Sequence, residues 1–122
     1  MNDQNTANRK FRKELNSGTV SLVLLGILYR TDRPMYGYEI TKHIDSGQTD
    51  APAMGQGALY PVLRSLEKSG LLSSRVEPSV SGPPRRYYNI TGPGRETLRD
   101  WTDAWEKTRD FVDSILKGNK DV

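Results

Sequence analysis

The chain has 122 residues, a net charge of +3 and no cysteine, which allows one domain with one core and excludes disulfides and thiolate metal sites. Its longest apolar run, residues 20–29, is shorter than the roughly 20 residues that cross a bilayer, so we expect a cytoplasmic protein without export or membrane anchoring. The basic excess lies in residues 1–94, whereas residues 95–122 are weakly acidic, which suits a domain that meets a polyanion with one side and its own copy with the other.

The N-terminal segment is predicted to contain a flexible lead-in and one short helix. Residues 1–8 are polar, and residues 9–16 place Phe11 and Leu15 on one face of an amphipathic helix with basic residues around them. The Ser-Gly pair at residues 17–18 predicts that this helix ends there.

Two further helices should follow, joined by a tight turn. Residues 19–29, TVSLVLLGILY, are apolar nearly all round, which predicts a buried helix that forms the main strut of the core. The Thr-Asp-Arg-Pro sequence at residues 31–34 should end it. Residues 36–45 then resume helical spacing, with Ile40 and Ile44 four positions apart.

Another helix is predicted after a loop. Residues 46–55, SGQTDAPAMG, are rich in turn formers and predict that loop. A helix should then span residues 57–69, because Pro61 is acceptable only close to a helix start and Gly70 supplies a left-handed stop. Its inner face consists of Leu59, Val62, Leu63 and Leu66.

A β-hairpin is predicted beyond this helix. Residues 71–76 and 86–90 have the composition of strands, and the segment between them, PSVSGPP at residues 78–84, is incompatible with a helix. The order helix, helix, turn, helix, hairpin predicts a mainly α fold with a small β-hairpin wing, the winged helix-turn-helix. In that fold the helix before the hairpin enters the major groove of DNA.

The C-terminal segment predicts one long helix. Thr91 can cap it, Pro93 fits its first turn, and Leu116 lies near its end, which gives a length on the order of 36 Å. A seam of residues repeats along it at steps of three and four, as in a heptad pattern. We expect the same helix of a second subunit to cover this seam in a two-fold dimer, to which Phe11 and Leu15 also contribute. The seam consists of Leu98, Trp101, Trp105, Thr108, Val112 and Ile115.

Three regions are therefore predicted along the chain. Residues 1–16 form the flexible N-terminus with its short amphipathic helix, residues 17–91 the winged helix-turn-helix DNA-binding domain, and residues 92–122 the C-terminal dimerisation helix. In the last region, acidic residues lie off the seam and pair with lysines at i,i+4 spacing, as Asp103 and Lys107 do, so the opposite face of the helix stays in water.

The outward face of the helix before the hairpin carries groups suited to DNA. Amide, hydroxyl and basic side chains at this face can contact base edges and phosphates. The alternative is an ordinary solvated face, since polar outer faces are the default of amphipathic helices. The candidate DNA-binding residues are Gln56, Gly57, Tyr60, Arg64 and Lys68.

The wing adds two basic residues. Arg85 and Arg86 directly follow a stiff Gly-Pro-Pro tip, which would hold both cations toward phosphates or a minor groove. The alternative is a solubilising charge pair at a hairpin end. We expect the next two residues, Tyr87 and Tyr88, to pack against the core and not to touch DNA.

The tryptophans are candidates for ligand binding, whereas the residues needed for common catalytic and metal sites are missing from the sequence. Trp101 and Trp105, one turn apart, either pack in the dimer or line a pocket for a flat apolar ligand. His43 stands without a second histidine or any cysteine, and no glycine-rich phosphate loop is present. We therefore expect neither an enzyme nor a metal or other cofactor.

Four sequence blocks carry a family resemblance: MYGYEI at residues 35–40, GALYPVLRSLEKSGLL at residues 57–72, GPPRRYYNIT at residues 82–91 and GPGRETL at residues 92–98. In this order and spacing they resemble the PadR family of bacterial transcriptional regulators. The resemblance implies a homodimeric repressor that binds a palindromic operator in double-stranded DNA and releases it when an effector binds or the dimer rearranges.

The resemblance also implies roles for individual residues. Tyr36 and Tyr60 match tyrosines that approach DNA in the family, and Arg85 and Arg86 match its basic wing residues. The single C-terminal helix is similar to the subfamily with small C-terminal domains. Some members of that subfamily sense planar aromatic drugs through a tryptophan at the position of Trp105.

Two positions depart from the family pattern. Ala58 stands where the family usually has threonine, which removes a hydroxyl near phosphate, and Pro93 stands where a polar residue is usual. Neither disturbs its helix. The rival functions are a winged-helix protein-interaction module and a ligand-binding dimer without affinity for DNA.

Overall fold

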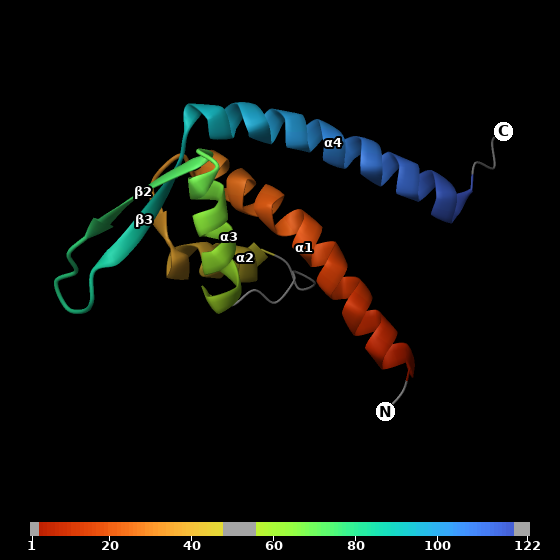
Figure 1. Cartoon of the computed structure of the whole chain (residues 1–122), viewed down its shortest axis with the longest axis horizontal. Helices are drawn as coiled ribbons and strands as arrows, with labels where there is room; N and C mark the ends of the chain where they lie inside the picture. The colour runs from red at the N-terminus through yellow and green to blue at the C-terminus, as the bar shows by residue number, and fades with distance from the viewer. Residues whose placement is uncertain (1–2, 48–55, 119–122) are drawn as a thin grey trace.

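The computed structural model describes residues 3–47 and 56–118, which form a mainly helical fold with one small antiparallel sheet. The predicted fold class, a winged helix-turn-helix with a long C-terminal helix, is confirmed. Figure 1 shows the hairpin at one end of the molecule and the two chain termini at the other. The elements are α1 (Asp3–Thr31), β1 (Met35–Tyr36), α2 (Gly37–Gly47), α3 (Gln56–Lys68), β2 (Leu72–Glu77), β3 (Arg85–Ile90) and α4 (Gly92–Lys117).

Helix α1 runs without interruption through the predicted break, so the prediction of a separate short helix ending at Ser17 and Gly18 is wrong. Residues 3–8, expected to be a flexible lead-in, are helical as well. A glycine inside a helix costs only about 1 kcal/mol relative to alanine. In this stretch of α1, Leu15, Gly18 and neighbouring residues line a groove against α4.

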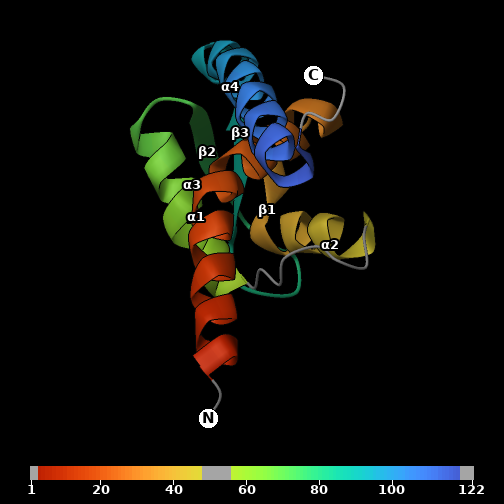
Figure 2. The same ribbon diagram turned by 90° about the vertical axis from the view of Figure 1, so that its right-hand side faces the viewer.

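The C-terminal half of α1 is the predicted strut of the core. Leu24, Leu25 and Leu28 are completely or almost completely buried. However, Val23 and Tyr29 are exposed, so this stretch is not buried all round as its composition suggested. Figure 2 shows α2 and α3 on opposite sides of α1, and both pack against it.

A short left-handed turn separates α1 from the next elements, as the Thr-Asp-Arg-Pro sequence predicted. The Thr31 hydroxyl donates back to the Ile27 carbonyl at 2.9 Å, and the Asp32 backbone N–H donates to the Leu28 carbonyl at 3.1 Å. Asp32 has a φ of 52°, in the left-handed region that commonly ends helices. Pro34 then prevents the helix from continuing.

The sheet contains one strand that the sequence did not predict. Its order is β1-β3-β2, with Tyr36 of β1 opposite Tyr87 of β3, and Leu72 of β2 opposite Ile90 of β3. β1 has two residues only, and its partner lies far along the chain, so no local pattern marks it. The predicted hairpin strands are confirmed, and we call β2, β3 and the segment between them the wing.

Helix α3 has the predicted inner face, since Leu59, Leu63 and Leu66 are buried and Val62 is half-buried. Pro61 lies inside this helix, which begins at Gln56, one residue before the predicted start. Of the predicted loop at residues 46–55, residues 48–55 lie outside the described residues, and the first two positions belong to α2.

The predicted long C-terminal helix is confirmed as α4. Thr91 is its N-cap, a proline occupies its first turn, and Gly118 with a φ of 68° follows its last residue. None of the helices in the described part of the chain is long and apolar enough to cross a membrane.

Candidate nucleic-acid interface

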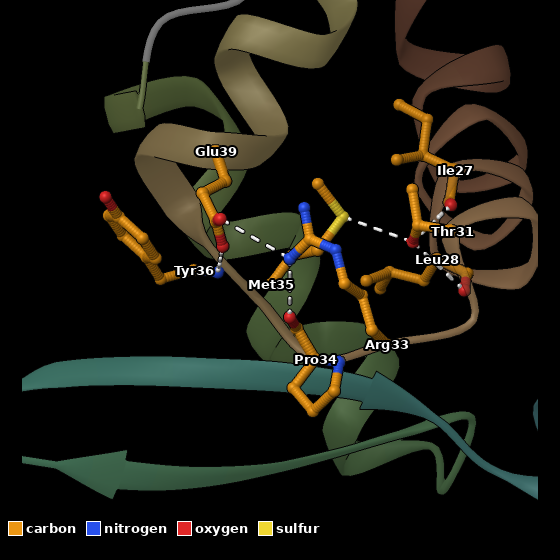
Figure 3. Close-up of polar contacts among 8 residues, drawn as sticks. All are labelled: Ile27, Leu28, Thr31, Arg33, Pro34, Met35, Tyr36 and Glu39. Atoms are coloured by element: carbon orange, nitrogen blue, oxygen red, sulfur yellow. Dashed lines mark hydrogen bonds and ion pairs between the residues drawn. The ribbon is translucent and has the colours of Figure 1, made fainter.

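Polar contacts fix the backbone around Tyr36 at the start of α2 (Figure 3). One oxygen of the Glu39 carboxylate accepts the Tyr36 backbone N–H at 3.2 Å, and the other pairs with the Arg33 guanidinium at 3.4 Å. Arg33 also donates to the Pro34 carbonyl at 3.2 Å. A carboxylate in the first helical turn satisfies a free backbone donor and complements the helix dipole. The backbone of Tyr36 is therefore held in place by the Glu39 carboxylate.

The Tyr36 ring is the centre of a cluster of aromatic and cationic side chains. It meets Tyr87 edge to face at a centroid distance of 5.4 Å and stacks on Tyr38 at 6.4 Å. The Arg85 guanidinium lies 4.4 Å from its centroid, and the Lys42 ammonium lies 5.6 Å from the centroid of Tyr38. We call these five residues the cation–aromatic cluster. It joins the wing to β1 and α2, although the wing and α2 are far apart in sequence.

Tyr60 reaches the same place from α3. A Cβ built on Gly37 would lie only 2.8 Å from the Tyr60 hydroxyl oxygen, so the tyrosine ring packs directly on the backbone of the first residue of α2. Any larger residue at position 37 would displace the Tyr60 ring from this place. The two tyrosines that the family resemblance singled out, Tyr36 and Tyr60, are thus brought together by the fold.

These side chains surround a cavity of about 430 Å³ between α2, α3 and the wing. Its lining is rich in hydroxyl and guanidinium groups and contains no carboxylate. Cations and hydroxyl donors without acidic neighbours are the groups that bind phosphate oxygens. The lining residues are Tyr36, Tyr38, Tyr60, Ser79, Ser81, Gly82, Pro83, Pro84, Arg85 and Arg86.

The two wing arginines have different partners, because neighbouring residues of a strand point to opposite faces of a sheet. Arg85 lies on Tyr36, whereas the Arg86 guanidinium donates to the Ser74 hydroxyl at 2.9 Å. That hydroxyl donates in turn to the Glu67 carboxylate of α3 at 2.7 Å. Arg86 is therefore tied to the end of α3.

The predicted core role of the wing tyrosines holds for Tyr88, which is 1% exposed. Burial raises the pKa of the Tyr88 phenol above its ordinary value, while the nearby Arg86 charge acts in the opposite direction. Tyr87 is half-buried and belongs to the cation–aromatic cluster.

The outward face of α3 continues from the cavity. Gly57, Arg64 and Lys68 are exposed, and Tyr60 is half-buried. Ala58 is also exposed, so its missing hydroxyl would have faced outward. Gln56 begins α3, but its side chain lies outside what the structure describes.

Sequence reasoning missed three residues of this site: Tyr38, Lys42 and Glu39. Tyr38 and Lys42 are four apart on α2, a spacing that places two side chains on one helix face and could have marked them. Glu39 stands three residues after Tyr36, the spacing at which a glutamate returns to the backbone N–H that precedes a helix. Its role could have been inferred from that signal.

A second concave site lies between α1 and α4, and we call it the α1–α4 groove. Its volume is about 570 Å³, and its lining is mainly apolar. Trp101 is half-buried and Trp105 is 39% exposed. The structure thus places both predicted ligand-binding tryptophans in one groove. The lining residues are Glu14, Leu15, Gly18, Thr19, Ser21, Leu22, Trp101, Ala104, Trp105 and Thr108.

The rest of the predicted seam divides into an inner and an outer part. Leu98 and Trp101 pack against the core of the same chain, because α1 is long enough to cover the first turns of α4. Beyond them the apolar side chains of α4 remain largely exposed, as do two in the N-terminal half of α1. These exposed residues are Trp105, Phe111, Val112, Ile115 and Leu116 on α4, and Phe11 and Leu15 on α1.

Among residues 3–47 and 56–118 no group of three or more histidine, aspartate or glutamate side chains is arranged to hold a metal ion.

Comparison with known proteins gives one consistent result. Residues 24–100 match the transcriptional regulator PadR-like family. A solved PadR family transcriptional regulator from Eggerthella lenta is 30% identical, with a TM-score of 0.80 over 96% of this chain and 98% of that chain. A PadR-like transcriptional regulator from Bacillus cereus is 30% identical, with a TM-score of 0.67 over 87% and 99%. An uncharacterised protein of Lysinibacillus sphaericus is 26% identical over 107 residues, 88% of this chain and 96% of that protein.

Proposed function

The chain belongs to the PadR-like family of transcriptional regulators, which bind DNA, and we propose from this that it is a homodimeric repressor of a palindromic operator. The wing and the outward face of α3 contact the DNA, and α4 joins the two subunits. A chain without cysteine folds without disulfides, which suits action in the cytoplasm.

The observation that carries this proposal is the cavity that joins α3 to the wing. Arg85 is stacked on Tyr36 and faces the same cavity as Tyr60 of α3. A helix seated in the major groove with a basic wing beside it needs this arrangement, because base edges and flanking phosphates are then contacted together. The exposed Arg64 and Lys68 extend the basic surface along α3.

A dimer is needed because a symmetric operator is read by two matched helices about one DNA turn, roughly 34 Å, apart. The exposed apolar side chains of α4 and of the N-terminal part of α1 provide the surface for it. Isolated exposed apolar residues are ordinary, but a row of them along one long helix is typical of an interface. Trp105, Val112 and Ile115 are the members of this row that the heptad spacing predicts.

The α1–α4 groove is the proposed effector site. A volume of about 570 Å³ with indole side chains in its lining is the size and chemistry that binds flat aromatic molecules. Glu14 is the one charged residue of that lining, so a planar aromatic cation is the preferred class. An effector bound there would favour another crossing of the two α4 helices in the dimer, misalign the two α3 helices and lower the affinity for the operator.

Selection of binding sites from a pool of random DNA duplexes tests the proposed function. We expect enrichment of an inverted repeat whose half-sites are about one helical turn apart. Enrichment of one unrepeated half-site would contradict the proposal that a dimer binds the operator. If nothing is enriched, a protein-interaction module or a ligand-binding dimer without DNA affinity would be favoured instead.

A further inference from the structure

The end of α3 and the start of α4 are joined through one hydroxyl group. The Thr91 Oγ1 hydroxyl donates to the Gly70 carbonyl at 2.7 Å and accepts the Gly94 backbone N–H at 3.0 Å. Its first bond goes to the turn that ends α3, and its second caps α4. A single side chain thus bridges the helix that meets DNA and the helix assigned to dimerisation.

The turn that receives this bridge is itself rigid. The Gly70 N–H donates to the Glu67 carbonyl at 2.9 Å and the Leu71 N–H to the Leu66 carbonyl at 2.9 Å, which is the pattern of a Schellman cap. Gly70 has the positive φ of 82° that this cap requires. The carbonyl that accepts the Thr91 hydroxyl therefore keeps a fixed position relative to α3.

Close packing reinforces the bridge. The Thr91 backbone N–H donates to the Leu71 carbonyl at 3.1 Å. Gly94 is buried, and a Cβ built on it would lie 2.1 Å from the same carbonyl oxygen, so the backbone of α4 touches the end of α3 without room for a side chain. The two helices cannot change their angle without breaking these contacts.

The first turn of α4 is also tied to α1. The Arg95 guanidinium pairs with the Asp32 carboxylate at 2.6 Å and lies 5.4 Å from the centroid of the Tyr29 ring. This pair is exposed and contributes little alone. It holds the first turn of α4 from a second direction, so rotation of α4 relative to α3 is opposed on two sides.

We propose that Thr91 and Gly94 are positioning residues that fix the angle between α3 and α4, and that this joint sets the separation of half-sites that the dimer accepts. The inference rests on the proposed function. The 26 residues of α4 span about 39 Å. A rotation of α4 by ~10° about its first turn therefore displaces its far end by roughly 7 Å. That displacement corresponds to about two base-pair steps of about 3.4 Å each.

Three substitutions of Thr91 distinguish the effect of its hydrogen bond to Gly70 from the effect of its helix cap on α4. Thr91→Ser keeps both hydrogen bonds and is the matched control. Thr91→Asp keeps an acceptor for the Gly94 N–H, and so caps α4, but has no hydrogen to donate to the Gly70 carbonyl. Thr91→Val has the shape of threonine and loses both bonds. Thr91 is half-exposed, so the aspartate carboxylate remains hydrated and the variant should fold.

The experiment measures affinity for the operator obtained by selection, for versions whose spacer is one or two base pairs longer or shorter, and for one isolated half-site. We expect wild type and Thr91→Ser to prefer one spacer by about tenfold or more. Thr91→Asp and Thr91→Val should reduce this preference to about threefold or less, with half-site affinity within about twofold of wild type.

The outcomes are distinct. Spacer profiles of Thr91→Asp and Thr91→Val that match wild type would overturn the inference. A flattened profile in Thr91→Val alone would also overturn it, because capping and not the bridge would then set the spacing. A wild-type protein that shows no spacer preference would instead refute the symmetric operator of the proposed function.

Discussion

The guanidinium of Arg85 lies 4.4 Å from the centre of the Tyr36 ring and so joins the wing to the start of α2. A cation over an aromatic ring at an exposed site contributes about 0.5–1 kcal/mol. The greater effect is on position, since the ring limits where the arginine can lie before DNA is bound. The wing and the first turn of α2 therefore present one surface.

Removal of the Tyr36 ring should weaken binding more than removal of its hydroxyl. We expect Tyr36→Leu to lower operator affinity about tenfold, of which roughly two- to fivefold reflects the lost contact with Arg85. Tyr36→Phe keeps the ring and should lose about threefold or less. Fluorescence anisotropy with a labelled operator at constant salt measures both. Equal losses in the two variants would show that the contact with Arg85 is irrelevant to binding.

Glu39 should act through its hydrogen bond to the Tyr36 backbone and not through its charge. Glu39→Gln keeps an oxygen that accepts this N–H, whereas Glu39→Ala does not. Both changes remove a negative charge near DNA, so the difference between them isolates the hydrogen bond. We expect Glu39→Ala to bind the operator about three- to tenfold more weakly than Glu39→Gln. Indistinguishable dissociation constants would contradict this role.

Gly94→Ala should destabilise the protein because the new Cβ would meet the Leu71 carbonyl oxygen. Relief of that clash requires a shift of backbone, and such overpacking costs about 1–3 kcal/mol. Gly92→Ala is the matched control, since no atom lies within 4 Å of its Cβ position. Urea denaturation should show a loss for position 94 and little change or a small gain for position 92. Equal stabilities would refute the close contact between α4 and the end of α3.

Tryptophan fluorescence should report directly on the α1–α4 groove, because both tryptophans of the chain lie in it. Titration with 9-aminoacridine, a planar aromatic cation, should quench the emission and saturate. Glu14→Gln removes the one charge of the lining and should weaken this binding about threefold or more. Quenching without saturation, or with the same affinity in Glu14→Gln, would argue against an effector site of this chemistry.

The core and the helix ends could be predicted from sequence because their signals are local. The leucine spacing of α3 predicted its buried face, Gly70 predicted its end, and Thr91 predicted the start of α4. Each of these depends on residues within one or two helical turns. The wing could be predicted for the same reason, since its two strands and its proline-rich turn each have a local composition signal.

The features that sequence reasoning missed depend on distant packing. Ser17 and Gly18 have the composition of a break, but α1, which packs against α4, runs through them without interruption. β1 consists of two residues and exists because Tyr36 pairs with Tyr87. That pairing also creates the cation–aromatic cluster, so the spacing of Tyr38 and Lys42 could place them on one face of α2 but could not show that this face meets Tyr36.

The dependence of duplex binding on salt tests most directly whether the wing and α3 form the DNA-binding surface. Each phosphate contact contributes a slope of about −0.9 to the logarithm of affinity against the logarithm of salt concentration. With two wing arginines in each subunit, Arg85→Ala with Arg86→Ala should make the slope shallower by about 2 to 4. Arg99→Ala with Lys107→Ala removes equal charge from α4 and should leave the slope within about 1 of wild type. An unchanged slope in the wing variant, or the same change in the α4 variant, would contradict the account.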